Sequence, residues 1–244
     1  MYIPKKTVSI IMSVYNEENT VQKVLAELKK IEYINEIIVV DNGSKDQSNQ
    51  LIKNSMKEDE RIQLFVINKN RGLGKAISLA IKNTKCDIIA RQDADLEYDP
   101  NELINLIEVL DKDLADVVYG SRMLVRKAHR VHYYYSYLAN IIITMFSNLV
   151  TNLFLSDVET AAKAFKGDIV RNVKWKSKGF EIENEMTIKL KRMGCIFYEV
   201  PFSYYGRPFK EGKKIRPFDG VKAIYYIIFY SLTKFFSVSK NKKM

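Results

Sequence analysis

Short apolar runs alternate with stretches of helical periodicity through the first half of the chain. The strand-like runs are Val8 to Val14, Glu36 to Asp41, Leu64 to Ile67, Cys86 to Arg91 and Asp116 to Tyr119. Between the first two, apolar residues recur at the spacing of one helix face, at Val21, Val24, Leu25 and Leu28. Strands that alternate with helices are typical of a mostly parallel sheet with helices on both faces. With 244 residues and 47% apolar content, the chain is expected to form one large α/β domain.

Polar residues follow these predicted strands at the points where the strands end. They are Tyr15-Asn16-Glu17, Asp41-Asn42-Gly43-Ser44, the loop Asn70 to Lys75, and the pair Asp93 and Asp95. Open α/β sheets bind ligands outside the carboxyl ends of their strands, so we expect these segments to surround one crevice. Each segment alone is also explained by ordinary turn chemistry.

The carboxylates of Asp93 and Asp95 are separated by one residue and follow a buried strand. Because side chains alternate along an extended chain, we expect both on one face, where they repel each other unless a cation lies between them. Oxygen ligands suit Mg²⁺ or Mn²⁺, whose shells phosphate oxygens and water complete. The nearby Gly72-Leu73-Gly74 loop is not a dinucleotide fingerprint, but its glycines could let the backbone approach a phosphate beside Lys75.

The rarest residue types exclude several kinds of site. His129 and His132 are the two histidines, which argues against a His-rich metal site or a Ser-His-Asp triad. Cys86 and Cys195 lie far apart in sequence and imply neither a zinc site nor a disulfide framework. Such cysteine usage is expected of a reducing cytoplasm. Because Met1 to Lys6 leads straight into the first strand, we expect no signal peptide.

Positive charge is concentrated in two segments. Tyr205 to Met244 contains ten lysines and arginines against two acidic residues, and Val117 to Ser156 contains four against none. Both segments are rich in Tyr, Phe and Ile. Basic residues among aromatic ones indicate a nucleic acid, an anionic membrane surface or an anionic substrate.

Two stretches of the second half suggest membrane-interface helices. Residues 133–155 contain no charged residue and are long enough to span a bilayer, but polar residues recur three or four positions apart, as on one face of an amphipathic helix. We expect a helix at the membrane interface, with a true span as the alternative. Residues 221–236 are a second such stretch, too short to span a bilayer comfortably and followed by a basic tail. A core-packing helix is the alternative for the second. We therefore expect a catalytic domain over residues 1–220, which includes the helix at about 133–155, and an amphipathic aromatic helix with a basic tail over 221–244.

Together these motifs resemble those of family-2 glycosyltransferases. The shared segments, in family order, are Ile11 to Glu17, Val39 to Ser44, Asn70 to Lys75 and Gln92 to Glu97. More narrowly, the chain is similar to bacterial enzymes that resemble dolichol-phosphate mannose synthase. That likeness rests on Gly120-Ser121-Arg122, Ser156 to Thr160 with Lys163-Ala164-Phe165, Gly179 to Ile182, Tyr198 to Pro201, Tyr204 to Arg207 and Glu211 to Ile215. It covers roughly residues 7 to 225.

The resemblance implies a glycosyltransferase-A (GT-A) fold and assigns roles to residues. The nucleotide-sugar would contact Val14, Tyr15, Glu17, Asp41, Gly72, Lys75, Gln92 and Asp93. Mg²⁺ or Mn²⁺ would be held by Asp93, Asp95 and Glu97. The acceptor phosphate would meet Arg122, Arg130, Ser136, Arg207 and Lys213. The catalytic set would be Asp95, Arg122, Asp157 and Arg207.

Three positions depart from the family pattern. Ser13 stands where proline is usual, and Asn42 where a further Asp is common. The second change removes a charge near the expected nucleobase, which leaves GDP and UDP both open. His132 stands where the family pattern has an Arg, and Arg130 is the candidate substitute for it.

The expected reaction is metal-dependent, inverting transfer of a hexose from a nucleoside-diphosphate sugar to a polyprenyl phosphate. The enzyme would lie peripherally on the inner face of the cell membrane. The alternative acceptor is a saccharide or lipid-linked sugar hydroxyl in cell-envelope assembly, which needs a base, with Asp157 or Glu159 as candidate. Nucleic acid is not an expected partner, because it would explain the charge but not the paired carboxylates. The sequence does not predict an oligomeric state.

Overall fold

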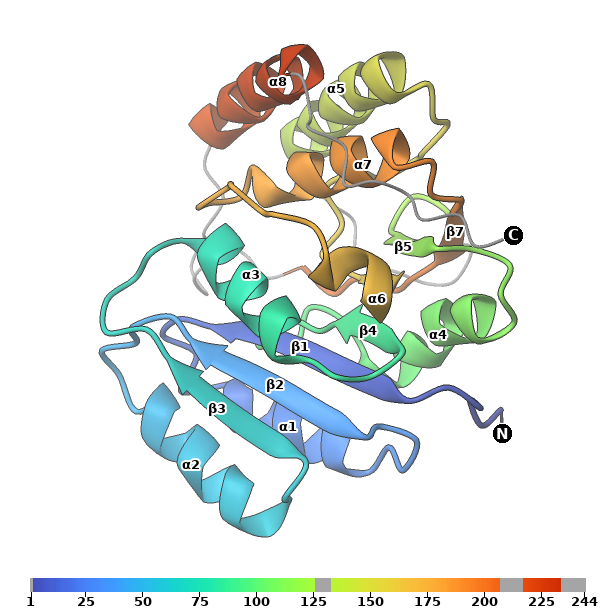
Figure 1. Ribbon diagram of the computed structural model, residues 1–244. Coiled ribbons are helices and arrows are strands. Elements are labelled where there is room, and N and C mark those ends of the chain that lie inside the picture. Colours follow the sequence, from blue (N-terminus) through green and yellow to red (C-terminus); the bar gives the residue numbers. More distant parts are fainter. Residues whose placement is uncertain (1, 126–132, 207–216, 234–244) are drawn as a thin grey trace.

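The computed structural model describes residues 2–125, 133–206 and 217–233 and contains one seven-stranded sheet (Figure 1). Its order is β3-β2-β1-β4-β6-β5-β7. The strands are β1 (Val8–Val14), β2 (Glu36–Asp41), β3 (Ile62–Val66), β4 (Ile88–Arg91), β5 (Val117–Ser121), β6 (Lys163–Lys166) and β7 (Phe197–Pro201). Strand β6 runs antiparallel to both neighbours, and the other pairs are parallel. The prediction of a mostly parallel sheet is confirmed.

Helices cover both faces of this sheet. One face packs against α1 (Val21–Lys29), α2 (Ser48–Glu58) and α4 (Leu103–Asp111), which follows the short 3₁₀ turn η1 (Pro100–Glu102). The other packs against α3 (Leu73–Asn83), α6 (Gly167–Arg171) and α7 (Ile182–Arg192). Helices α5 (Tyr134–Thr151) and α8 (Pro217–Leu232) lie beyond α7, side by side at the top of Figure 1.

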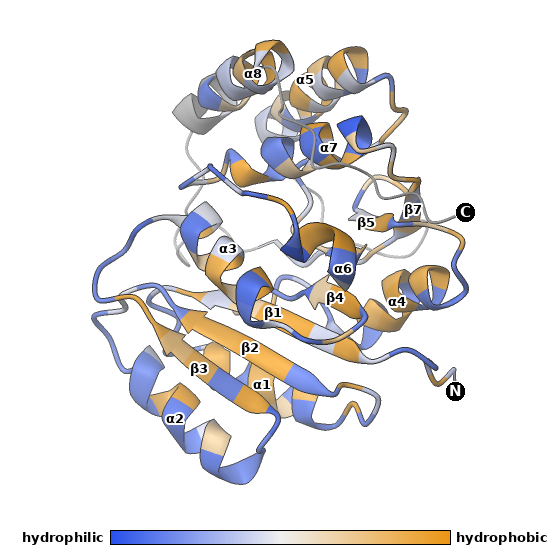
Figure 2. Ribbon diagram, in the orientation of Figure 1, coloured by the Kyte–Doolittle hydropathy of each residue, from blue (hydrophilic) through white to orange (hydrophobic). Residues whose placement is uncertain are grey.

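Alternation along the strands separates the two cores. Ile37 and Val39 of β2 belong to the core under α1, whereas Ile38 and Val40 belong to the core under α3. Successive side chains of a strand point to opposite faces, and a strand covered on both faces is apolar throughout. The central strands are accordingly hydrophobic along most of their length (Figure 2).

The structure adds two strands that periodicity did not indicate. Strand β6 has only four residues and contains Lys163, whose ammonium is fully buried and paired with Glu183. A lysine interrupts the apolar run by which a central strand is recognised. Strand β7 lies at the sheet edge, where burial is partial.

The second amphipathic stretch begins earlier than residue 221, because α8 starts at Pro217. Its Ala223, Ile227 and Tyr230 are buried in the same core as α7, and the Tyr230 hydroxyl lies 2.8 Å from that of Ser177. The described part of the predicted C-terminal segment therefore shares the core of the rest of the chain.

Helix α5 places its polar face against the protein and its apolar face outward. The buried positions include Asn140, Thr144, Ser147 and Thr151. Tyr135, Met145 and Leu149 are 84%, 58% and 79% exposed. This reverses the usual arrangement of a surface helix, in which the apolar stripe faces the core. Among the described helices, none is both long enough and apolar enough to cross a bilayer.

We predict that Glu183→Gln lowers the free energy of unfolding by about 3 to 5 kcal/mol, because it removes the carboxylate paired with buried Lys163 and leaves buried Arg91 with Asp93 as its remaining ion-pair partner. Burial opposes ionisation of Glu183, but the two cations outweigh it and lower the pKa of this carboxyl. The stabilisation is therefore present above the unfolded pKa of about 4.3 and is lost as the pH falls. Urea unfolding at pH 7 and at pH 3 measures both effects.

The matched control is Glu27→Gln, which removes an exposed ion pair with Lys30 and should change stability by less than about 0.5 kcal/mol. Equal effects of the two substitutions would contradict the prediction.

Candidate active site

The predicted polar segments meet at one edge of the sheet. Val14, the last residue of β1, lies in register with Asp41, the last residue of β2. Strand β4 ends at Arg91 opposite Ile11, and the Gln92 amide donates to the Ile11 carbonyl at 3.1 Å. The loops after β1, β2 and β4 therefore leave the sheet on the same side, as the crevice prediction requires.

Asp41 and Asn42 organise the loop after β2. The carboxylate of Asp41 is 2% exposed and accepts from the Ser44 amide at 2.9 Å and from Asn49 Nδ2 at 2.7 Å. Asn42 Oδ1 accepts from the Arg71 amide at 3.0 Å, while its Nδ2 donates to Asn70 Oδ1 at 3.3 Å. An Asp at 42 could not donate, so the amide here joins the loop after β2 to the loop before α3.

The loop after β1 is fixed to the start of α2. Val14 is fully buried, Tyr15 is half-buried, and Glu17 is 7% exposed. The Glu17 amide donates to Ser48 Oγ at 2.8 Å, and Glu17 Oε2 accepts from Thr20 Oγ1 at 3.0 Å. The predicted nucleoside-side residues are thus held in place by the protein itself.

The glycines of the Gly72-Leu73-Gly74 loop make room for another segment of the chain. A Cβ at Gly72, where φ is +89°, would lie 2.2 Å from the Lys178 carbonyl oxygen, and one at Gly74 would lie 2.6 Å from that of Ser177. The close approach in the structure is therefore between two backbones, and contact with a phosphate stays a prediction. Lys75 lines an open hollow of about 340 Å³ together with Val66, Ile67, Asn68, Arg71 and Leu79.

Asp93 and Asp95 lie in a turn after β4, which corrects the expectation that strand alternation aligns them. The strand ends at Arg91, and Leu96 has a left-handed φ of +63°. Asp95 Oδ1 accepts from the Glu97 amide at 3.1 Å. Gln92 Nε2 closes the turn by donating to the carbonyls of Asp93 at 3.2 Å and Tyr98 at 3.0 Å. Local side-chain hydrogen bonds, rather than pleating, set the directions of these carboxylates.

Arg91 and Asp93 form an ion pair at the start of this turn. Arg91 Nη2 lies 3.3 Å from Asp93 Oδ1, and Arg91 also pairs with Glu183 beneath the turn. Burial raises the pKa of the Asp93 carboxyl against the opposing charge of Arg91. Arg91 therefore interacts electrostatically with both the half-buried Asp93 and the buried Glu183.

The predicted three-carboxylate metal group is not assembled. Across residues 2–125, 133–206 and 217–233, no three His, Cys, Asp or Glu side chains form a metal-binding group. After the left-handed turn at Leu96, Glu97 Oε2 accepts from the Tyr204 hydroxyl at 2.8 Å, and its carbonyl accepts from the Tyr205 amide at 2.8 Å. Asp93 and Asp95 still offer the donor set that suits Mg²⁺ or Mn²⁺, which bind one or two carboxylates and take the rest of their shell from phosphates and water.

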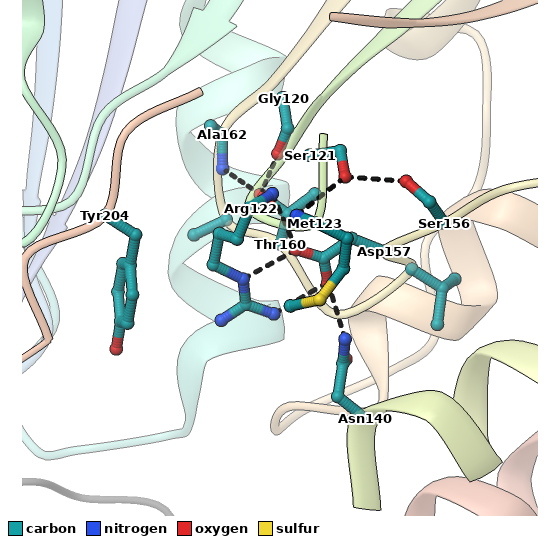
Figure 3. A network of polar contacts seen from close by, with 12 residues as sticks. Gly120, Ser121, Arg122, Met123, Asn140, Ser156, Asp157, Thr160, Ala162 and Tyr204 are labelled. Carbon is teal, nitrogen blue, oxygen red and sulfur yellow. Dashed lines mark hydrogen bonds and ion pairs between the residues drawn. The ribbon is translucent and has the colours of Figure 1, made fainter. Parts of the chain in front are cut away.

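Arg122 and Asp157 form a bidentate ion pair at the end of β5 (Figure 3). Arg122 Nε donates to Asp157 Oδ2 at 2.6 Å and Nη2 to Oδ1 at 2.7 Å, while the Arg122 amide donates to Oδ2 at 3.1 Å. The side chain of Asp157 is fully buried and that of Arg122 is 16% exposed. A fourth donor, Nδ2 of Asn140 on α5, contacts Asp157 Oδ1 at 3.1 Å. All of these bonds hold the guanidinium in one orientation.

The two candidate bases differ in their ionisation. Burial disfavours the charged form of Asp157, but the Arg122 guanidinium outweighs it and lowers the pKa of Asp157. Burial and the neighbouring charge of Glu183 raise the pKa of Glu159 to about 7, although Asn184 Nδ2 donates to Glu159 Oε1 at 2.7 Å. Asp157 is thus suited to positioning Arg122, and Glu159 is the better proton acceptor of the two.

Tyr204 connects Arg122 to the turn after β4. The Arg122 guanidinium lies 5.2 Å from the centre of the Tyr204 ring, and the hydroxyl of the same ring contacts Glu97. Tyr98 and Tyr204 pair as an isolated bridge, with ring centres 5.1 Å apart. Sequence reasoning did not assign roles to Tyr98 or Asn140, although Asn140 belongs to the polar repeat of the 133–155 stretch.

The structure describes two of the five predicted acceptor-site residues, Arg122 and Ser136. Arg130, Arg207 and Lys213 lie outside the described residues. Ser136 is exposed on α5, one turn before Asn140. Arg122 is therefore the predicted acceptor residue for which the structure describes a built environment.

Comparisons with known proteins bear on the family and the fold. The model of the family described as glycosyl transferase family 2 matches residues 9–196. An uncharacterised protein of Methanocaldococcus jannaschii is 26% identical over 231 residues, covering 93% of each chain. An undecaprenyl-phosphate 4-deoxy-4-formamido-L-arabinose transferase of Pectobacterium atrosepticum is 31% identical over 170 residues, which are 68% of this chain and 50% of the relative. A Pseudomonas fluorescens protein of the same name is 34% identical over 49% of this chain and 37% of its own.

The chain thus spans about half of these transferases or less. Among solved structures, glucosyl-3-phosphoglycerate synthase from Mycobacterium tuberculosis with Mn²⁺, UDP and phosphoglyceric acid superposes with a TM-score of 0.71 at 16% identity, over 94% of this chain and 80% of that one. This likeness concerns the fold. The expected GT-A fold and family are confirmed: the chain belongs to glycosyl transferase family 2 and is a glycosyltransferase.

Proposed function

We propose that this glycosyltransferase moves a hexose from a nucleoside-diphosphate sugar to a polyprenyl phosphate at a membrane surface, with inversion at the anomeric carbon. The observation that carries the proposal is the position of the Arg122–Asp157 pair. It lies between the turn after β4 and a helix whose apolar face points outward. Relatives named as undecaprenyl-phosphate transferases support the acceptor class.

On the donor side, Asp93 and Asp95 would hold Mg²⁺ or Mn²⁺ against the diphosphate. When bound, such an ion neutralises the charge that develops on the leaving nucleoside diphosphate. Gln92 and the Glu97 amide fix the turn that presents the two carboxylates. These bonds are made within the chain, so the protein itself holds the turn in the conformation that presents the carboxylates.

On the acceptor side, Arg122 would bind the phosphate. Asp157 occupies Nε and Nη2, and among the described residues Nη1 has no hydrogen-bond acceptor. A guanidinium suits phosphate oxygens, and this one is held in a fixed orientation. Arg130, Arg207 and Lys213 stay predicted further contacts.

The transfer itself needs no protein base with such an acceptor. A phosphate oxygen, anionic at neutral pH, attacks the anomeric carbon, and the bond from that carbon to the diphosphate oxygen breaks with its electron pair leaving on the nucleoside diphosphate. Attack from the opposite face inverts the centre. The lowered pKa of Asp157 fits this scheme, because a carboxylate that only positions Arg122 must stay ionised.

A lipid surface is the partner we propose for the outer face of α5 and α8. Exposed apolar and aromatic side chains there include Tyr135, Met145, Leu149, Tyr225 and Leu232. Exposed apolar faces of this kind mark protein or membrane contacts. The basic residues of 117–156 and 205–244 favour an anionic membrane, and the inner face of the cell membrane is the proposed location.

A hydroxyl acceptor is the second candidate. The specific observation in its favour is Glu159, half-buried, held by Asn184, and with its pKa raised to about 7. Such a carboxyl can take up a proton near neutral pH. A saccharide or lipid-linked sugar would then be the acceptor.

A transfer assay separates the two. We expect labelled sugar from a UDP- or GDP-linked donor to appear on polyprenyl phosphate, and EDTA to abolish transfer until Mg²⁺ or Mn²⁺ is restored. Asp95→Asn should reduce the rate by about 10²-fold or more, because it weakens charge neutralisation on the leaving group. Label found only on saccharide hydroxyls, and lost in Glu159→Gln, would replace the first proposal by the second.

Arg122→Lys should raise the KM for the acceptor by about tenfold or more, because lysine cannot make the bidentate bond to Asp157 and phosphate together. Nucleotide affinity, measured by calorimetry, should change little. Arg171→Lys is the matched control, since Arg171 donates to the Cys86 carbonyl away from the site. A change confined to nucleotide affinity in Arg122→Lys would contradict the assigned role.

Charges on the outer face of α5 should release the protein from membranes. Met145→Glu with Leu149→Glu should reduce flotation with anionic vesicles by about tenfold or more, because binding would move two charged side chains from water into apolar surroundings. Leu114→Glu, at a position 49% exposed after α4, is the control. Unchanged flotation would refute the lipid contact, and a dimer that dissociates in the double variant would identify a second copy as the partner.

A further inference from the structure

The inward face of α5 contacts one short segment of the site at three successive turns. Asn140 Nδ2 donates to Asp157 Oδ1 at 3.1 Å, and Thr144 Oγ1 accepts from the Val158 amide at 3.2 Å. Asn148 accepts from the Leu155 amide at 3.0 Å and donates to the Leu155 carbonyl at 2.8 Å. A movement of α5 therefore acts directly on residues 155–158.

Of these contacts, the one through Asn140 reaches the guanidinium. Its acceptor is the oxygen of Asp157 that also accepts Nη2 of Arg122 (Figure 3). Beyond Arg122, the ring of Tyr204 lies 5.2 Å away and its hydroxyl contacts Glu97. One line of polar contacts thus runs from the membrane-facing helix to the turn after β4.

Asn140 also has a cost that packing does not explain. The residue is 8% exposed, and its Oδ1 has no hydrogen-bond partner among the described residues. A buried carbonyl without a partner is destabilising, and this offsets part of what the bond from the Asn140 amide to the Asp157 carboxylate contributes. The Asn140 side chain is therefore better explained by the carboxylate that it orients.

We propose that Asn140 is a positioning residue, through which contact of the outer face of α5 with a lipid surface sets the orientation of Arg122. The inference rests on the proposed function and adds regulation of the same site. Docking restrains α5, Asn140 restrains Asp157, and the guanidinium is then held ready for the phosphate. The result is activation by the membrane surface itself, separate from the concentration of acceptor in it.

The lipid surface, rather than a second copy, is the occupant that charge favours. The stretch before α5, 117–132, and the stretch after α8, 233–244, contain eight basic residues and no acidic one. Two such flanks would repel each other across a symmetric dimer, whereas an anionic bilayer attracts both. Tyr133, Tyr134, Tyr135 and Tyr225 are also exposed, and tyrosine is enriched at membrane interfaces.

The experiment uses a short-chain, water-soluble prenyl phosphate as acceptor, with and without acceptor-free phosphatidylglycerol vesicles. For the full chain we expect vesicles to lower the KM for this acceptor by about fivefold or more. Asn140→Ala should float with vesicles as the full chain does, but its KM should no longer respond to them. Asn140→Gln, which keeps an amide donor, should recover part of the response.

Asn148→Ala is the matched control, because it removes the same side chain two turns along the same helix face without touching Asp157. It should keep the vesicle response, and thermal melts identify any variant that fails to fold. The inference would be overturned if the KM of Asn140→Ala responded to vesicles as that of the unchanged chain does. It would also be overturned if Asn148→Ala lost the response to the same extent as Asn140→Ala.

The inference and the proposed function fail differently. If sugar is transferred to the prenyl phosphate and vesicles do not change the KM of that transfer, the inference alone is overturned. No transfer to any prenyl phosphate, with or without vesicles, would overturn the proposed function and the inference with it. If the protein forms a dimer through the outer face of α5 and its activity does not depend on vesicles, a second copy covers this face instead of a lipid surface.

Discussion

The bidentate ion pair of Arg122 and Asp157 is the interaction on which the acceptor half of the molecule depends. It joins the end of β5 to the segment before β6, and every oxygen of Asp157 accepts two hydrogen bonds. The Asp157 amide is held in turn by Glu199. Burial of an ion pair returns little net stability, because desolvation offsets the attraction. The arrangement is better understood as a way to hold the Arg122 guanidinium in one orientation while 16% of its side chain stays exposed.

Helix α5 is inverted for the same reason. A surface helix normally turns its apolar stripe to the core, but the inward face of α5 also meets the backbone of residues 155–158 and the Asp157 carboxylate, which polar side chains satisfy. Ile143 is buried in the core on this face, while many of the other apolar residues of the helix lie on the outside. Surface chemistry that suits a membrane and internal chemistry that holds the site are therefore two consequences of one sequence pattern.

The sequence was sufficient where burial on both faces makes a strand apolar throughout, as in β1 and β2, and where loops follow such strands. It was insufficient where contacts between residues distant in sequence determine which residues form a strand or which way a side chain points. Lys163 lies in a strand because Glu183, twenty residues later, neutralises it. Asp93 and Asp95 leave the strand because Gln92 and Leu96 form a turn. The polar repeat of α5 was visible, but its direction depends on Asp157, which no periodicity reveals.

The donor and acceptor halves differ in how much neutral contacts contribute. On the donor side, neutral hydrogen bonds from Asn42 and the close approach at Gly72 join loops of the crevice, while the buried Arg91 pairs with Asp93 at the turn after β4. The acceptor half depends on buried charge, which is sensitive to any change in its neighbours. Tyr204 contacts both, through Arg122 and Glu97. Tyr204 is therefore a side chain through which the Arg122–Asp157 pair and the turn after β4 are in contact.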